Sequence, residues 1–174
     1  MTESIDTILG IQAREIRSLK KSIKEFDKAI EDLVQIMPEH KCLESIPGVG
    51  PVYAGGILAE IGQIERFTNQ AGLAKYAGLT WKKHDSDKRQ SENTPLRRTG
   101  NHFLRYYLVE AANSVIRHVP EYKTFYQMKA AEVPRNKHKQ AITMTARKFT
   151  RLVYTLLSEH QLYMPQKEIY KDKS

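Results

Sequence analysis

The chain has 174 residues, of which 40% are hydrophobic, and it carries a formal net charge of +8. This length provides one ordinary core plus an additional segment, and the hydrophobic content suits a globular domain rather than a membrane protein. No apolar run is long enough to span a bilayer, and the N-terminus lacks the features of a signal peptide. Cys42 is the single cysteine, which excludes an intrachain disulfide. We therefore expect a cytoplasmic protein without a membrane partner.

The positive charge is distributed unevenly along the chain. Residues 1–44 contain 7 Lys/Arg against 9 Asp/Glu, and residues 45–79 contain 2 against 2. Residues 80–116 contain 7 against 4, and residues 117–174 contain 12 against 5. The basic excess therefore lies in the second half, which favours a polyanionic partner and salt-sensitive binding. Because many soluble proteins are mildly basic without binding nucleic acid, charge alone decides little.

Apolar residues alternate at steps of three and four through residues 5–37, which predicts a long amphipathic helix of coiled-coil type. Pro38 is expected to end it. Such a helix buries its seam against a second copy or another segment, and the alternative is packing onto its own domain. The seam consists of Ile5, Leu9, Gln12, Ile16, Leu19, Ile23, Phe26, Ile30, Leu33 and Met37.

Residues 43–58 predict two short helices joined by a glycine hairpin, the pattern of a helix-hairpin-helix motif that grips the nucleic-acid backbone. Glycines can adopt positive φ and let their N–H groups approach a ligand closely. At the positive end of the following helix, these amides form a site for one phosphate. The alternative is a tight turn between packed helices. The residues expected to bind are Pro47, Gly48, Val49 and Gly50.

The remaining periodicity predicts helices and no strands, so the expected fold class is all-α. Thr68 or Asn69 is expected to cap a short helix that Gly78 terminates. Residues 80–98 are polar and predict an exposed loop. Further helices are expected at about 101–117, 121–131 and 137–160. The domains would be a coiled-coil helix at 1–38, a helical domain at 40–164 and a flexible tail at 165–174.

Several motifs follow the hairpin in a fixed order: Tyr76-Ala-Gly-Leu79, a loop serine, Thr99-Gly-Asn101 and Leu104-Arg105. Over residues 40 to 164, this order resembles the C-terminal domain of IS110-type insertion-sequence transposases. The resemblance implies a full-length protein with an N-terminal RuvC-like nuclease domain of the DEDD type, a coiled coil and this domain. It also implies an element-encoded guide RNA and a serine that attacks a DNA phosphodiester.

By position, Ser86 matches that serine. A serine hydroxyl needs a proton acceptor, and the phosphorane oxygens need positive charge. Basic residues that can supply such charge and bind DNA are Lys82, Lys83, Arg97 and Arg98. Asp87 stands where the family usually has glycine, and its carboxylate would repel phosphate. Without the resemblance, a solvated loop serine is the default interpretation of Ser86.

The start of the predicted helix near residue 101 offers further candidates for DNA binding. Thr99 is a plausible N-cap, which would leave Gly100 and Asn101 to present free N–H groups to a phosphate. Arg105, one turn into the helix, would reach the same phosphate or pair with Glu110 instead.

We expect the DNA-binding, serine-bearing part of a bacterial, nucleoid-associated transposase or recombinase. The sequence leaves no space before the heptad helix for a nuclease domain, so we expect no strand transfer by this chain alone. No cofactor is expected in this chain, because the divalent metal (Mg²⁺) would belong to the nuclease domain. Neither the carboxylates nor the histidines of this chain have metal-ligand spacing. The alternatives are a non-catalytic helix-hairpin-helix module and a purely structural oligomerisation module.

Overall fold

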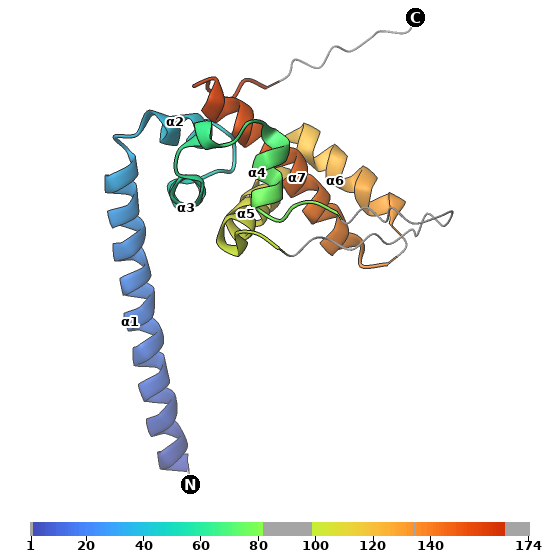
Figure 1. Cartoon of the computed structure of the whole chain (residues 1–174). Coiled ribbons are helices and arrows are strands. Elements are labelled where there is room, and N and C mark those ends of the chain that lie inside the picture. The colour runs from blue at the N-terminus through green and yellow to red at the C-terminus, as the bar shows by residue number, and fades with distance from the viewer. Residues whose placement is uncertain (1, 82–98, 134, 166–174) are drawn as a thin grey trace, which may run out of the picture.

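The computed structural model describes residues 2–81, 99–133 and 135–165. Across these ranges the only strand-like feature is a single bridge residue at Trp81. The predicted all-α fold is therefore confirmed (Figure 1). The elements are α1 (Thr2–Val34), α2 (Pro38–Glu44), α3 (Pro51–Ile61), the 3₁₀ turn η1 (Ile64–Arg66), α4 (Gln70–Tyr76), α5 (His102–His118), α6 (Pro120–Glu132) and α7 (Lys137–Ser158).

Helix α1 extends away from the body formed by the other helices (Figure 1). Its C-terminal turns pack on α3, where Ile30 and Val34 lie so close that a Cβ on Gly55 would stand 3.0 and 3.4 Å from their side chains. Farther along, the seam is open to solvent, with Leu19 64% and Phe26 68% exposed. Packing onto the chain's own domain thus accounts for the end of the seam and leaves the rest uncovered.

The boundary after α1 differs from the sequence expectation. The helix ends at Val34, three residues before the end of the predicted seam, and Pro38 begins α2. Proline at a first helical position loses nothing, because an N–H there has no intrahelical partner. Pro120 is likewise the first residue of a helix, α6. Both prolines therefore start helices as well as closing the segments before them.

The core is centred on α5 and α7, which pack together (Figure 1). Tyr122 of α6 meets the buried Phe149 of α7 edge-on, with ring centroids 6.3 Å apart. Phe103 lies in the first turn of α5 and is 56% exposed, so it lies outside this core. The fully buried residues of α5 and α7 include Leu104, Leu108, Ala111, Ala112, Val115, Ala146, Phe149 and Val153.

Both ends of α4 follow the sequence prediction. The Asn69 side chain accepts hydrogen bonds from Ala71 N and Gly72 N, each at 3.0 Å. At the other end Gly78 has a φ of +68°, and Leu79 N donates to Ala74 O at 2.8 Å. This is the Schellman arrangement that glycine permits at the end of a helix. It fixes the direction in which the chain leaves α4.

In the part of the chain that the structure describes, no helix combines the length and apolar character that crossing a membrane requires.

Candidate nucleic-acid interface

The glycine hairpin joins α2 to α3 as predicted, but its two glycines differ in conformation. Gly48 has a φ of +94°, in the region that favours glycine, whereas Gly50 has a φ of −92°. Gly50 is the N-cap of α3 and is extended, so it does not use the positive φ that glycine permits. Val49 is buried between them, as expected for a residue that fills the turn.

The hairpin leaves a group of backbone donors open. Val49 N donates to Ile46 O at 2.9 Å, which closes the turn internally. Among the described residues, no protein acceptor takes the N–H groups of Gly48 or Gly50, nor those of Val52 and Tyr53 in the first turn of α3. No side chain caps this helix and no acidic residue lies in its first turn. The positive end of the helix dipole is therefore uncompensated there, which is the condition for anion binding.

Contacts that the sequence did not reveal hold the turn in place. A Cβ on Gly48 would lie 2.7 Å from His118 Nδ1 and 3.1 Å from the Ser114 carbonyl, so only glycine fits against α5. Ser45 Oγ donates to Cys42 O at 2.7 Å and accepts from Tyr163 N at 2.7 Å. Ser45 thus ties the hairpin to the segment after α7. A serine directly after a short helix is a signal for a local backbone bond, but nothing in the sequence pointed to Tyr163.

The second glycine turn, before α5, is organised differently from the prediction. Asn101, not Thr99, is the N-cap of α5, and its Oδ1 accepts from Phe103 N and Leu104 N, each at 3.0 Å. Asn101 N itself donates to Tyr76 O at 2.7 Å. The expectation of a free Asn101 N–H is therefore wrong, because the end of α4 already takes this donor.

Gly100 is required by close packing at the same junction. It has a φ of +122°, and a Cβ there would lie 2.4 Å from Tyr76 O and 2.9 Å from Gly78 N. A side chain would collide with backbone, which cannot give way as a flexible side chain would. Gly100 is thus explained by the approach of two chain segments.

The Asn101 side chain extends this junction to α3. Its Nδ2 donates to Glu60 Oε2 at 2.6 Å and to Tyr76 Oη at 3.3 Å. Arg66 lies over the ring of Tyr76 with its Cζ 4.6 Å from the centroid. The hydrogen bond from Asn101 and then the one from Arg66 lower the pKa of Tyr76, because both donors favour the phenolate. One asparagine therefore connects α3, α4 and α5.

Arg105 also points to the end of α4. Its Nη1 donates to Ala77 O at 3.3 Å, and Glu110 is not its partner. The structure thus brings Gly100, Asn101 and Arg105 together around one helix end, where each has a structural contact. Any contact of these residues with DNA remains a prediction.

Five predicted site residues lie outside the described residues: Ser86, Lys82, Lys83, Arg97 and Arg98. The described chain reaches Trp81 on one side of this segment and resumes at Thr99 on the other.

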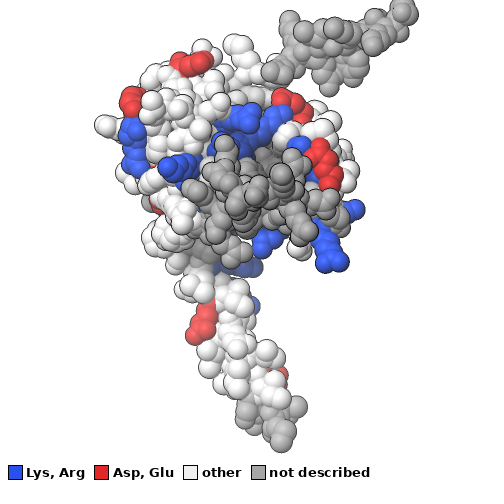
Figure 2. All heavy atoms as spheres, turned by 45° about the vertical axis from the view of Figure 1, so that its right-hand side comes forward, with Lys and Arg blue, Asp and Glu red and all other residues white. Residues whose placement is uncertain are grey.

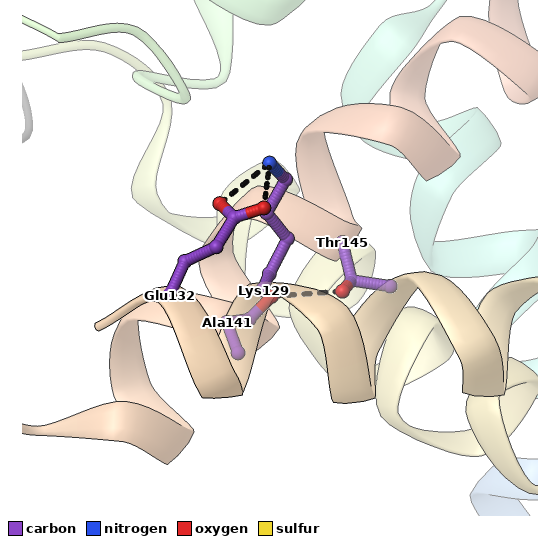
Figure 3. Close-up of polar contacts among 4 residues, drawn as sticks. All are labelled: Lys129, Glu132, Ala141 and Thr145. Atoms are coloured by element: carbon purple, nitrogen blue, oxygen red, sulfur yellow. Dashed lines mark hydrogen bonds and ion pairs between the residues drawn. The ribbon is translucent and has the colours of Figure 1, made fainter. Parts of the chain in front are cut away.

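Basic side chains gather on one face of the helical body (Figure 2). Two lysines are neutralised within the protein: Lys129 Nζ lies 2.7 Å from Glu132 Oε2, as Figure 3 shows, and Lys148 Nζ lies 2.5 Å from Glu121 Oε1. Figure 3 also shows the buried Thr145 hydroxyl donating to Ala141 O, which satisfies that polar group without leaving its helix. A carboxylate therefore already neutralises one lysine of α6 and one of α7.

The described residues contain no group of three or more His, Cys, Asp or Glu side chains that could hold a metal ion.

The chain is thus an all-α protein in which a glycine turn joins two helices, α2 and α3. The sequence model described as "Transposase IS116/IS110/IS902 family" matches residues 40–127, from α2 into α6. This match covers half of the chain, so the chain belongs to the IS116/IS110/IS902 family of transposases. The suspected resemblance is confirmed, and the chain is part of an insertion-sequence transposase.

Curated relatives align along most of this chain. It is 24% identical over 165 residues to the transposase for insertion sequence element IS1111A of Coxiella burnetii, covering 94% of this chain and 45% of that protein. It is 29% identical over 160 residues to the insertion element IS900 uncharacterized 42 kDa protein of Mycobacterium paratuberculosis, covering 91% and 39%. The pilin gene-inverting protein of Moraxella bovis is 29% identical over 151 residues, covering 84% and 46%. The chain thus spans less than half the length of these relatives.

Proposed function

We propose that this chain is the part of an IS110-family transposase that binds the DNA backbone, with the turn at residues 47–50 and the start of α3 holding one phosphate. The observation that carries the proposal is the set of open amides on Gly48, Gly50, Val52 and Tyr53. Membership of a transposase family makes DNA the natural source of that phosphate.

Binding at this turn would be independent of base sequence. Backbone N–H groups donate to phosphate oxygens, which every nucleotide presents, so such contacts position the nucleic acid without reading it. The basic excess of the second half of the chain adds long-range attraction. Target choice would then lie elsewhere, and the guide RNA implied by the resemblance is the proposed source.

Titration of the chain into a labelled duplex oligonucleotide, followed by fluorescence anisotropy at several salt concentrations, tests this proposal. We expect the logarithm of affinity to fall linearly with the logarithm of salt concentration, with a slope of roughly −0.9 for each phosphate neutralised. Absence of binding at low salt would overturn the proposal and favour a structural oligomerisation module.

Ser86 is proposed as the nucleophile of DNA strand cleavage and joining, working together with a RuvC-like nuclease domain that supplies any divalent metal. Reconstitution with such a domain tests this role. The Ser86→Ala variant should lose joined product while retaining DNA affinity. If Ser86→Ala joined DNA as well as the wild type, the chain would be a non-catalytic binding module. If the chain alone formed joined product, the proposed dependence on the nuclease domain would be wrong.

The open seam of α1 is proposed to associate with a second copy of the chain. The exposed residues Leu19, Ile23 and Phe26 continue a regular heptad pattern, which pairs naturally with an identical helix. Sedimentation equilibrium tests this proposal with Leu19→Asp, which should shift the chain toward monomer. Ser18→Asp adds the same charge outside the seam and should leave the mass unchanged. A wild-type chain that is monomeric at all concentrations would refute association.

A further inference from the structure

A half-buried arginine on α7 lies beside the chain that leaves α4. Arg147 Nη1 donates to Leu79 O at 3.4 Å, a distance at the weak end of the hydrogen-bond range. Two residues earlier, Ala77 O accepts from Arg105 of α5 at 3.3 Å. Two guanidinium groups from different helices therefore contact the same short stretch of backbone.

Arg147 has no compensating negative charge within the part of the chain that the structure describes, since it forms no ion pair there. Its charged neighbour is another cation, Arg151, one turn along α7. Burial lowers the pKa of Arg147, and Arg151 lowers it further. A cation that is partly desolvated next to a like charge is unfavourable unless an anion joins it.

One lysine of α6 and one of α7 each have a carboxylate partner, which Arg147 lacks among the described residues. Lys148, the next residue on α7, pairs with Glu121 and lies 5.0 Å from the ring centroid of Tyr122. Lys129 pairs with Glu132 (Figure 3), and its Nζ lies 5.7 Å from the ring centroid of Phe125. Lys129 and Lys148 are thus neutralised within the protein, whereas no carboxylate among the described residues pairs with Arg147 or Arg151.

We propose that Arg147 and Arg151 form a second phosphate-binding site, which takes a backbone phosphate of the nucleic acid at a point separate from the glycine hairpin. This proposal rests on the proposed function, because it takes DNA as the source of the phosphate. The planar guanidinium presents parallel N–H donors that match two oxygens of one phosphate, and its weak hydration suits a half-buried position. The bond to Leu79 O holds Arg147 in place, and its other donors form no hydrogen bond with the residues that the structure describes.

Variants that each remove one positive charge test the site. Arg147→Gln should weaken binding to a duplex oligonucleotide about tenfold, corresponding to one charge-assisted interaction of ~1.4 kcal/mol. It should also reduce the salt slope by about 1. Arg151→Gln should act in the same direction. Lys129→Gln is the matched control and should change affinity less than about twofold, because its charge is already neutralised. Thermal unfolding of each variant identifies any loss that comes from misfolding.

A second probe addresses the site without DNA. Titration with sodium tripolyphosphate, followed by the arginine Nε–Hε resonances in NMR spectra, should shift Arg147 saturably in the wild type. In Arg151→Gln the shift should require higher concentrations, and in Lys129→Gln it should be unchanged. If the wild type binds duplex and Arg147→Gln binds it no more weakly than Lys129→Gln, this site is overturned and the proposed function stands. If the wild type binds no duplex, the proposed function fails, and an unshifted Arg147 resonance would overturn the phosphate site as well.

Discussion

Two glycine turns of this chain differ in how the helix that follows each of them is capped. At the turn at 47–50, no acceptor among the described residues takes the N–H groups of Gly48 and Gly50, or the two in the first turn of α3. At the turn at 99–101, Asn101 N donates to Tyr76 O, and the Asn101 side chain caps α5. Both sequences predicted phosphate binding from glycine next to a helix start. Such a pattern therefore marks a tight junction in both places, and the partners of each amide determine which N–H groups are left for a ligand.

The largest expected effect concerns Gly100. Gly100→Ala should lower the free energy of unfolding by about 3 kcal/mol, because the new Cβ meets backbone at a positive φ. Urea denaturation measures this change. Gly10→Ala is the control, since a Cβ on Gly10 would meet no atom within 4 Å. Gly10→Ala should leave the free energy of unfolding unchanged or higher. If Gly100→Ala were tolerated equally well, close packing would not explain the glycine at position 100.

Asn101→Ala should cost about 2 kcal/mol of stability. About 1 kcal/mol comes from the N-cap and a similar amount from the lost bonds to Glu60 and Tyr76. Asn69→Ala removes a cap without such a network and should cost about half as much. Equal losses in the two variants would mean that the link between α3 and α5 contributes nothing.

Gly50→Ala should produce the opposite pattern to Gly100→Ala. Gly50 has a negative φ, and a Cβ there would meet no protein atom within 4 Å. Stability should therefore change by less than about 1 kcal/mol. The added methyl group would crowd a phosphate at the open amides, so duplex affinity should fall about fivefold, or ~1 kcal/mol. Anisotropy titration measures this, and unchanged affinity would argue against the hairpin as a phosphate site.

The smallest expected effect is on tyrosine ionisation. The pKa of Tyr76 is lowered by its donors, whereas burial raises the pKa of Tyr122. In an ultraviolet absorbance titration Tyr76 should therefore ionise before Tyr122. Asn101→Ala should move the Tyr76 titration upward, because its main hydrogen-bond donor is lost. No movement would mean that this bond is absent in solution.

The same two tyrosines have opposite consequences for stability. A lowered phenol pKa contributes stability that is present above the ordinary value near 10 and lost as pH falls. A raised pKa contributes stability that is present below that value and lost as pH rises. Because the shift at Tyr122 is the larger one, the chain should become less stable as pH increases above about 10.

Local signals in the sequence predicted most of the helices. Asn69 and Gly78 bracket α4 because capping depends on residues within a few positions of the helix end. The end of α1 was predicted less well, because the seam pattern continues to Met37 whereas the helix ends at Val34. Periodicity records which residues share a face, but it does not fix the last hydrogen bond.

The site was less predictable, because its geometry depends on contacts between distant segments. Thr99 and Asn101 are both acceptable caps by residue type, and the approach of Tyr76 to this turn, which also requires Gly100, selects Asn101. Arg147 resembled any other basic residue on an amphipathic helix. Only the structure shows that, among the described residues, Lys148 and Lys129 pair with carboxylates and Arg147 does not.

The bridge from Tyr163 to Ser45 has a consequence for the smallest fragment that retains the hairpin's shape. Tyr163 lies five residues beyond the last residue of α7, yet its N–H is bonded to the turn between α2 and α3. A truncation at the end of the last helix would keep every helix and still release this tether. Boundaries chosen from secondary structure alone would thus loosen the turn that offers its amides, and expression designs should extend past Tyr163.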